Sequence, residues 1–224
     1  MEQGRRLTVT AWVVGLLGVA LVVGSVLWLR TGYVLSTVSG ESMKPTYTVG
    51  DRVVVERVGG DELRRGDVVL YTAPARYGGG LGVVQRVIGV GGDRVVCCED
   101  AGTARERISV NGKPLRESYV NHGVADGLRR AYDVEVPDGR LFVLGDNRTN
   151  ARDSRLFPED HGGTVPVGAV VGRVTDSSAM PLLLGGSTLL GFLLAVVGIV
   201  LGFVARSVRR RPAAAQLVLW PEHL

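Results

Sequence analysis

Two long runs of uncharged, mostly apolar residues lie near the ends of this chain of 224 residues. The first, Leu7–Leu29, has 23 residues, and the second, Pro181–Ala205, has 25. At about 1.5 Å per residue, a helix over either run crosses a hydrocarbon core of about 30 Å. The sequence therefore predicts transmembrane helices over residues 7–29 and 181–205, with one domain over residues 30–180 between them.

Arginines flank both runs on the side of the chain termini. Arg5 and Arg6 precede the first run, and Arg206 and the arginines at 209–211 follow the second. Because cytoplasmic loops carry an excess of Lys and Arg, the ends 1–6 and 206–224 are predicted to be cytoplasmic. The domain over residues 30–180 is then extracytoplasmic.

A cleaved signal peptide is the alternative explanation of the first run. The apolar part of a signal peptide usually has about 7–15 residues and ends in a small-residue cleavage site. Leu7–Leu29 is longer, and Arg30 closes it. Both features favour a transmembrane helix that is retained in the mature protein over a signal peptide that is cleaved off.

The net charge of +4 does not indicate a nucleic-acid partner. Residues 31–180 contain 19 basic and 20 acidic residues, so the positive excess is confined to the ends of the two apolar runs. A nucleic-acid-binding domain carries its basic residues on the folded part of the chain. Nucleic acid is therefore excluded as an expected partner.

The segment between the apolar runs is typical of an antiparallel β domain. Its short β-branched runs are separated by Gly and Asp, with connections too short for the crossovers of a parallel sheet. Asn111-Gly112 is a strong hairpin-turn signal. The fold class predicted is mainly β, a domain of antiparallel hairpins or a small barrel flanked by two transmembrane α-helices. The predicted strands are 51–58, 66–71, 81–90, 94–96, 141–144 and 167–174.

Three segments of this domain carry unusual polar patterns. Ser39–Thr46 places serines in a loop with Gly and Pro, and Gln85–Asp93 runs from a strand into a glycine turn. Gly145–Arg155 follows an apolar strand and holds three Arg, two Asp and two Asn. So many polar groups at a strand end indicate a network of ion pairs and side-chain-to-backbone hydrogen bonds that fixes a loop.

These segments, in this order, resemble the boxes of the type I signal peptidases, membrane-bound serine proteases that remove signal peptides from exported proteins. The matching segments are Ser42–Thr46, Arg86–Asp93, Val110–Gly112 and Gly145–Arg155. The resemblance implies a bacterial cell-membrane protein whose partners are the lipid bilayer and membrane-inserted preproteins with signal peptides. It implies cleavage after small residues of the Ala-x-Ala type, without a metal or an organic cofactor.

The resemblance also implies roles for individual residues. Ser42 corresponds to the nucleophile, whose backbone N–H donates to the oxyanion, and Met43 and Pro45 are expected to line the substrate cleft. The family's general base is a lysine directly before Arg86. Expected supporting residues are Arg86, Asp146, Asn147, Arg148, Ala151, Asp153, Ser154 and Arg155, with Asp153 and Arg155 as an ion pair.

The sequence departs from the family's pattern at the base. Gln85 stands in the lysine's place, and an amide has no lone pair that is basic near neutrality. Ala151 stands where the family usually has a serine that orients the lysine. Two hypotheses follow: a signal peptidase with an unusual or absent base, or a catalytically impaired homologue that binds signal peptides or partner proteases without cleaving them.

Lys44, Lys113, His122 and His161 are the other candidate bases. Lys44 is two residues after Ser42 and lies on the same side of an extended segment. Lys113, His122 and His161 are expected to be exposed loop residues.

Cys97 and Cys98 are adjacent. A disulfide prefers Cα atoms about 5.5–6 Å apart, so free or externally paired thiols are expected here.

Overall fold

The computed structural model describes residues 2–103, 106–128, 130–175 and 179–210. The chain forms two compact units. One contains the two long helices, and the other is the domain over residues 31–177.

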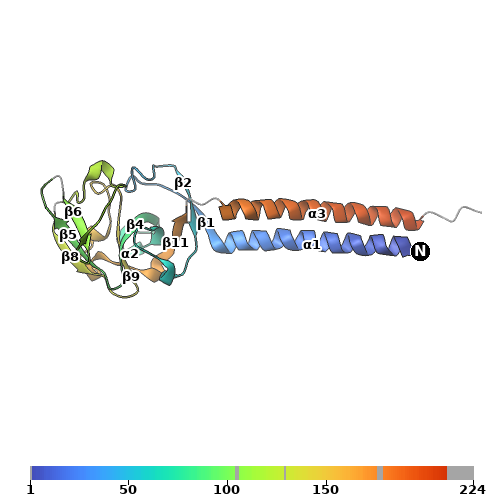
Figure 1. Ribbon diagram of the computed structural model, residues 1–224, viewed down its shortest axis with the longest axis horizontal. Coiled ribbons are helices and arrows are strands. Elements are labelled where there is room, and N and C mark those ends of the chain that lie inside the picture. The colour runs from blue at the N-terminus through green and yellow to red at the C-terminus, as the bar shows by residue number, and fades with distance from the viewer. Residues whose placement is uncertain (1, 104–105, 129, 176–178, 211–224) are drawn as a thin grey trace, which may run out of the picture. The chain divides into compact units, whose positions relative to one another are not determined.

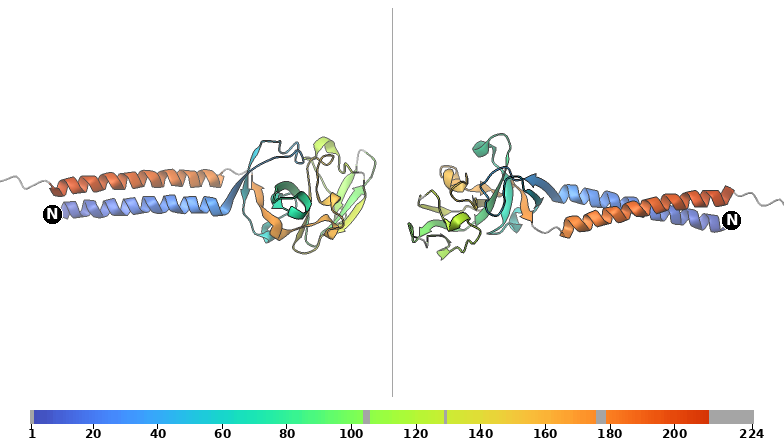
Figure 2. Two further views of the ribbon diagram at one scale, coloured as in Figure 1. Left: turned by 180° about the vertical axis from the view of Figure 1, so that it is seen from behind. Right: turned by 90° about the horizontal axis from the view of Figure 1, so that it is seen from above.

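The helical unit consists of α1 (Glu2–Gly32) and α3 (Ala179–Arg210). Over Arg5–Gly32 and Ala179–Val208, both are long and apolar enough to cross a membrane. They lie side by side (Figure 2). A Cβ atom on Gly198 would come within 2.6 Å of the Gly15 Cα atom, so this close approach depends on glycine.

The larger sheet of the second unit has seven antiparallel strands in the order β1-β2-β11-β3-β4-β9-β10 (Figure 1). The strands are β1 (Tyr33–Thr37), β2 (Arg52–Glu56), β3 (Val68–Thr72), β4 (Gly82–Val90), β9 (Arg140–Leu144), β10 (Val165–Pro166) and β11 (Val170–Thr175). A single-turn helix, α2 (Pro74–Tyr77), connects β3 with β4.

The smaller sheet has four strands in the order β7-β6-β5-β8. They are β5 (Arg94–Glu99), β6 (Arg107–Val110), β7 (Lys113–Pro114) and β8 (Tyr132–Glu135). The 3-10 turns are η1 (Gly60–Glu62), η2 (Asn121–Gly123), η3 (Ser154–Leu156), η4 (His161–Gly163) and η5 (Val167–Ala169).

The middle of the larger sheet is buried on both faces. Successive side chains of a strand point to opposite faces, and β3 follows this rule. Val68 and Leu70 join one apolar cluster, and Val69 and Tyr71 join another. A third cluster packs the smaller sheet against β4 and β9, through Ile88 and Phe142 among others.

The predicted fold class, mainly antiparallel β flanked by two long apolar helices, is confirmed. Each of the six predicted strands overlaps an observed strand, and Asn111 and Gly112 form the predicted turn, both with positive φ. The start of the predicted strand 167–174 is wrong, because Val167–Ala169 is the turn η5. Strands β1, β8 and β10 were not predicted.

The expectation for the two cysteines is wrong. Cys97 and Cys98 form a disulfide with each other. The peptide bond between them is cis, and their Cα atoms are 3.0 Å apart. The prediction rested on the usual Cα separation of about 5.5–6 Å, and this pair is bonded at a much shorter one.

Candidate active site

Ser42 lies in a tight turn between β1 and β2. The Lys44 N–H donates to the Glu41 carbonyl at 3.2 Å, and the Tyr47 N–H donates to the Met43 carbonyl at 3.0 Å. The Met43 side chain is fully buried in the cluster with Val68 and Leu70, so the next residue of the turn anchors Ser42 to the core. Ser42 itself is only partly buried.

Ser42 borders a cleft of about 220 Å³. It is lined by residues 37–40, 42 and 43 of the chain, by the start of β4 and by Leu81, Tyr77 and Arg152. Neither the hydroxyl nor the backbone N–H of Ser42 donates a hydrogen bond to a described residue. Both groups are therefore available to a ligand in the cleft. Met43 also lines this cleft, whereas Pro45 does not, and the substrate-binding role of both residues stays a prediction.

The segment Gly145–Arg155 supports the Ser42 turn directly. The Asn147 N–H donates to the Ser42 carbonyl at 2.8 Å. A Cβ atom on Gly145 would lie 2.6 Å from that same carbonyl oxygen and would collide with the Ala151 side chain. The glycine is thus required by the close approach of two backbone segments.

Asp146 links this segment to β4 and to the Ser42 turn. Its carboxylate accepts two hydrogen bonds from the Arg86 guanidinium, at 2.8 and 2.6 Å, and one from the Thr46 hydroxyl at 2.5 Å. The Arg86 guanidinium also stacks 3.9 Å from the centre of the Tyr119 ring. Such a bidentate pair fixes both partners in orientation as well as in distance.

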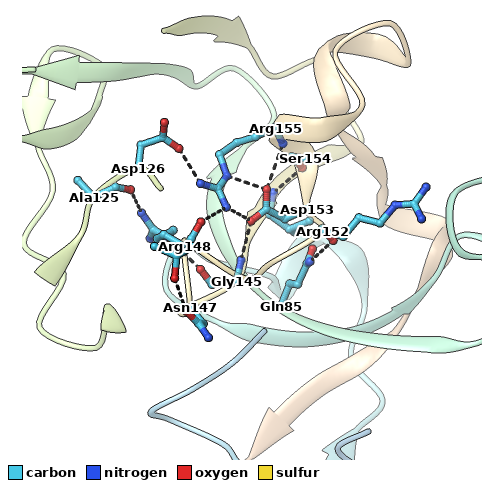
Figure 3. A network of polar contacts seen from close by, with 12 residues as sticks. Gln85, Ala125, Asp126, Gly145, Asn147, Arg148, Arg152, Asp153, Ser154 and Arg155 are labelled. Atoms are coloured by element: carbon cyan, nitrogen blue, oxygen red, sulfur yellow. Dashed lines mark hydrogen bonds and ion pairs between the residues drawn. The ribbon is translucent and has the colours of Figure 1, made fainter. Parts of the chain in front are cut away.

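Arg155 is the centre of a buried ion-pair network (Figure 3). It donates to Asp153 at 2.8 and 2.7 Å, to Asp126 at 2.6 Å and to the Arg148 carbonyl at 3.0 Å. All three charged side chains are at most 1% exposed. Burial disfavours the charge of Arg155, but the hydrogen bonds and charges of Asp153 and Asp126 outweigh it and raise the pKa of the guanidinium.

Two further contacts connect this network to the strands. Asp153 accepts from the Gly145 N–H at 3.1 Å, and the Ser154 hydroxyl accepts from the Val143 N–H at 3.0 Å. Arg148 is 1% exposed and donates to Gly145, Ala125 and Glu117. The predicted Asp153–Arg155 pair is therefore observed, within a larger frame than the sequence indicated.

Gln85 is fully buried, and both polar atoms of its amide are engaged. Its Oε1 atom accepts from the Tyr71 hydroxyl at 2.7 Å, and its Nε2 atom donates to the Arg152 carbonyl at 2.7 Å. Gln85 pairs with Val69 across the strands, and its neighbour Val84 lines the Ser42 cleft together with Gly82 and Val83. No hydrogen bond joins Gln85 to Ser42 among the described residues.

Tyr77, which lines the cleft, also contacts the residues that bind the Gln85 amide. Its hydroxyl donates to the Arg152 carbonyl at 2.8 Å and lies 3.0 Å from the Tyr71 hydroxyl. Burial is the main cause that raises the pKa of both tyrosines, so both hydroxyls keep their protons near neutral pH. Neither tyrosine can therefore act as a base.

The alternative bases are engaged or remote from the cleft. The Lys44 ammonium pairs with the Glu41 carboxylate at 2.7 Å, and the hydrogen bond from Lys44 lowers the pKa of Glu41. Lys113, His122 and His161 are exposed and do not line the Ser42 cleft, as expected for loop residues. His161 contacts Asp160 at 3.0 Å.

The comparisons with known proteins agree with this frame. The family described as signal peptidase, peptidase S26, matches residues 7–177. The chain belongs to the signal peptidase family. The match includes the first apolar helix and nearly all of the β domain, from the Ser42 turn to the end of β11.

Individual relatives carry the same name. The signal peptidase I of Mycobacterium tuberculosis is 31% identical over 185 residues, 61% of this chain and 61% of the relative. This chain therefore spans about three fifths of that relative's length. Signal peptidase IB of Staphylococcus aureus is 35% identical over 156 residues, 62% of this chain and 74% of the relative. A crystal structure of a signal peptidase I from Enterococcus faecalis is 28% identical, covering 51% of this chain and 97% of that one, with a TM-score of 0.38.

Sequence reasoning missed three groups near the site. Tyr71 and Tyr77 bind the Gln85 amide and the Arg152 carbonyl, and Asp126 shares Arg155 with Asp153. No motif marks them. Arg152 lies within the recognised segment Gly145–Arg155, but the sequence alone does not distinguish it from the other arginines there.

Proposed function

We propose that this protein is a membrane-bound serine endopeptidase of the signal peptidase I type. It removes N-terminal signal peptides from exported preproteins after small residues, with Ser42 as the nucleophile. The observation that carries this proposal is the Ser42 hydroxyl, which has no hydrogen-bond acceptor among the described residues and borders a cleft held by the Gly145–Arg155 frame.

The proposed location is a bacterial cell membrane, with spans over residues 7–29 and 181–205. The arginines outside the two helices favour cytoplasmic ends at 1–6 and 206–224 and an extracytoplasmic domain over 30–180. Ser42 is 13 residues beyond Leu29, so even an extended chain reaches only about 45 Å. A substrate anchored in the same bilayer by its signal peptide suits this tether.

In the proposed reaction the Ser42 oxygen attacks the scissile carbonyl, and the Ser42 N–H stabilises the oxyanion. The hydroxyl proton needs an acceptor. Gln85 cannot accept it, and Lys44 pairs with Glu41, so water takes the proton. The same water returns the proton to the leaving amine as the peptide C–N bond breaks, and a second water hydrolyses the Ser42 ester and restores the hydroxyl. A positioned general base is worth about 10²–10⁴-fold in rate, and we expect turnover to be lower by that factor than with a lysine dyad.

A second candidate function is recognition of signal peptides or partner proteases without cleavage. One observation favours it: the Gln85 amide is buried and satisfied by Tyr71 and the Arg152 carbonyl, as expected for a side chain with a structural role. The cleft and its supporting frame are retained in either case. The two candidates therefore differ in the chemical step and agree on the ligand.

The deciding experiment compares four proteins, each full-length in detergent: the wild type, Ser42→Ala, Gln85→Lys and Gln85→Lys/Ala151→Ser. The substrate is an Ala-x-Ala preprotein, and cleavage and binding are measured separately. The peptidase proposal predicts slow wild-type cleavage that Ser42→Ala abolishes. The recognition proposal predicts binding by an inert wild type.

The lysine variants test the reasoning about the base. A lysine at position 85 replaces the amide in an apolar environment, where burial favours the neutral amine that can accept the Ser42 proton. Gain of cleavage in Gln85→Lys/Ala151→Ser, abolished by adding Ser42→Ala, supports the cleft assignment. If no variant binds or cleaves the preprotein, both candidates are wrong.

A further inference from the structure

Arg152 is the one charged residue among the twelve that line the Ser42 cleft. The neighbouring charges of the Ser42 turn, Glu41 and Lys44, pair with each other and are not part of the lining. The rest of the lining is apolar, small or hydroxyl-bearing. A single guanidinium therefore sets the electrostatic character of the cleft.

This guanidinium has no hydrogen-bond acceptor or ion-pair partner in the part of the chain that the structure describes. The other arginines of the segment do: Arg148 donates to Glu117, and Arg155 donates to Asp153 and Asp126. Figure 3 shows the Arg152 side chain pointing away from that network. Its N–H donors are thus available to a ligand.

The Arg152 side chain is nevertheless held in place. Its guanidinium carbon lies 5.2 Å from the centre of the Phe157 ring and 5.8 Å from that of Tyr77. Its own carbonyl accepts from Gln85 at 2.7 Å and from Tyr77 at 2.8 Å, which fixes the backbone. Aromatic rings attract the cation without accepting a hydrogen bond at each of its N–H donors.

A planar guanidinium with free donors matches a carboxylate, which can accept two parallel hydrogen bonds from it. Because the group is oriented before binding, less conformational entropy is lost when a carboxylate binds. We propose that Arg152 is a specificity-determining residue that binds a carboxylate of the peptide in the Ser42 cleft. This inference rests on the proposed peptide-binding function.

Two parts of a peptide can supply the carboxylate. One is an Asp or Glu side chain of the intact preprotein. The other is the terminal carboxylate of a signal peptide that has been severed after its last small residue. Both sources offer the same carboxylate to Arg152. If the source is a side chain, Arg152 binds the substrate, and if it is the new C-terminus, Arg152 binds the product.

The test measures binding of fluorescent Ala-x-Ala peptides to the full chain in detergent, in the Ser42→Ala background so that no peptide is cut. In the first arm, one Glu is moved along an amidated peptide, and Gln at the same position is the neutral match. In the second arm, a peptide ending in Ala-x-Ala carries either a free carboxylate or an amide. Arg152→Gln is compared with Arg57→Gln, an exposed arginine outside the cleft.

We expect at least one acidic peptide to bind about 5- to 10-fold more tightly than its neutral match, an effect of the size of a partly exposed ion pair. Arg152→Gln removes the difference, Arg57→Gln keeps it, and added salt weakens it. The arm that shows the effect identifies the source. Equal binding of every acidic and neutral pair overturns the inference while the proposed function stands. If neutral peptides also fail to bind, the proposed function is wrong and this inference falls with it.

Discussion

Replacing Arg155 by Met tests whether the buried ion-pair network holds the domain together. The substitution keeps an unbranched apolar side chain but removes four hydrogen bonds, three to Asp153 and Asp126 and one to the Arg148 carbonyl. Both carboxylates are at most 1% exposed, so neither can turn to water. Removing one partner of a buried ion pair costs about 3–5 kcal/mol, because a charge is left without compensation.

A loss of that size is a large share of the free energy of unfolding of an ordinary domain, about 5–15 kcal/mol. The assay is pulse proteolysis of the full chain in urea, with hydrogen exchange at the Gly145 amide, which donates to Asp153, as a local readout. The matched control is Arg94→Met, which breaks a pair with Asp133 whose side chains are 60% and 47% exposed. We expect little measurable change from the control.

The reasoning is refuted if Arg155→Met costs no more free energy of unfolding than Arg94→Met, or if exchange at the Gly145 amide is no faster than in the wild type.

Three further predictions concern other contacts. Gly145→Ala should cost about 1–3 kcal/mol in urea unfolding because its Cβ meets the Ser42 carbonyl, whereas Gly40→Ala, with open space around it, should cost little. Gln85→Leu should cost about 1–3 kcal/mol, and a double-mutant cycle with Tyr71→Phe should be non-additive because the two share a hydrogen bond; additive costs would contradict this. Burial opposes ionisation of Asp93, but hydrogen bonds from Arg65, Val90 and Asn111 outweigh it and lower the pKa of the carboxyl. Its contribution to the free energy of unfolding is therefore complete above about pH 4 and is lost as the pH falls through the lowered pKa. The stability gap between wild type and Asp93→Asn should therefore be constant near neutrality and shrink in acid-unfolding measurements; a gap that widens in acid would count against this assignment.

The parts of the fold that sequence reasoning predicted are those with a local signal. Alternating Val-rich runs predicted β2 to β5, and Asn111-Gly112 predicted the β6–β7 turn because both residues accept positive φ. Strands β1 and β8 gave no such signal: β1 follows α1 with no intervening residue, and β8 is only four residues long.

The candidate site likewise has parts that a local sequence signal predicts and parts that it does not. The segment Gly145–Arg155 could be recognised as a unit, including its Asp153–Arg155 pair. The partners that complete it lie far away in the sequence: Gln85 and Arg152 are 67 residues apart, and Asp126 and Arg155 are 29 apart. Such contacts depend on strand order and on which face a residue occupies, and neither follows from one sequence. The cis peptide at Cys97–Cys98 was likewise unpredictable, because nearly every non-proline bond is trans.

The disulfide between Cys97 and Cys98 has a simple consequence for how the domain withstands unfolding. A crosslink strengthens a protein chiefly by shortening the free chain of the denatured state, and the gain grows with the length of the enclosed loop. Here the bonded residues are immediate neighbours, so the ring encloses no other residue and the denatured chain stays nearly as free as without it. The domain therefore relies on its arginine-centred ion pairs and its apolar clusters, and adding a reductant should leave its unfolding midpoint almost where it was.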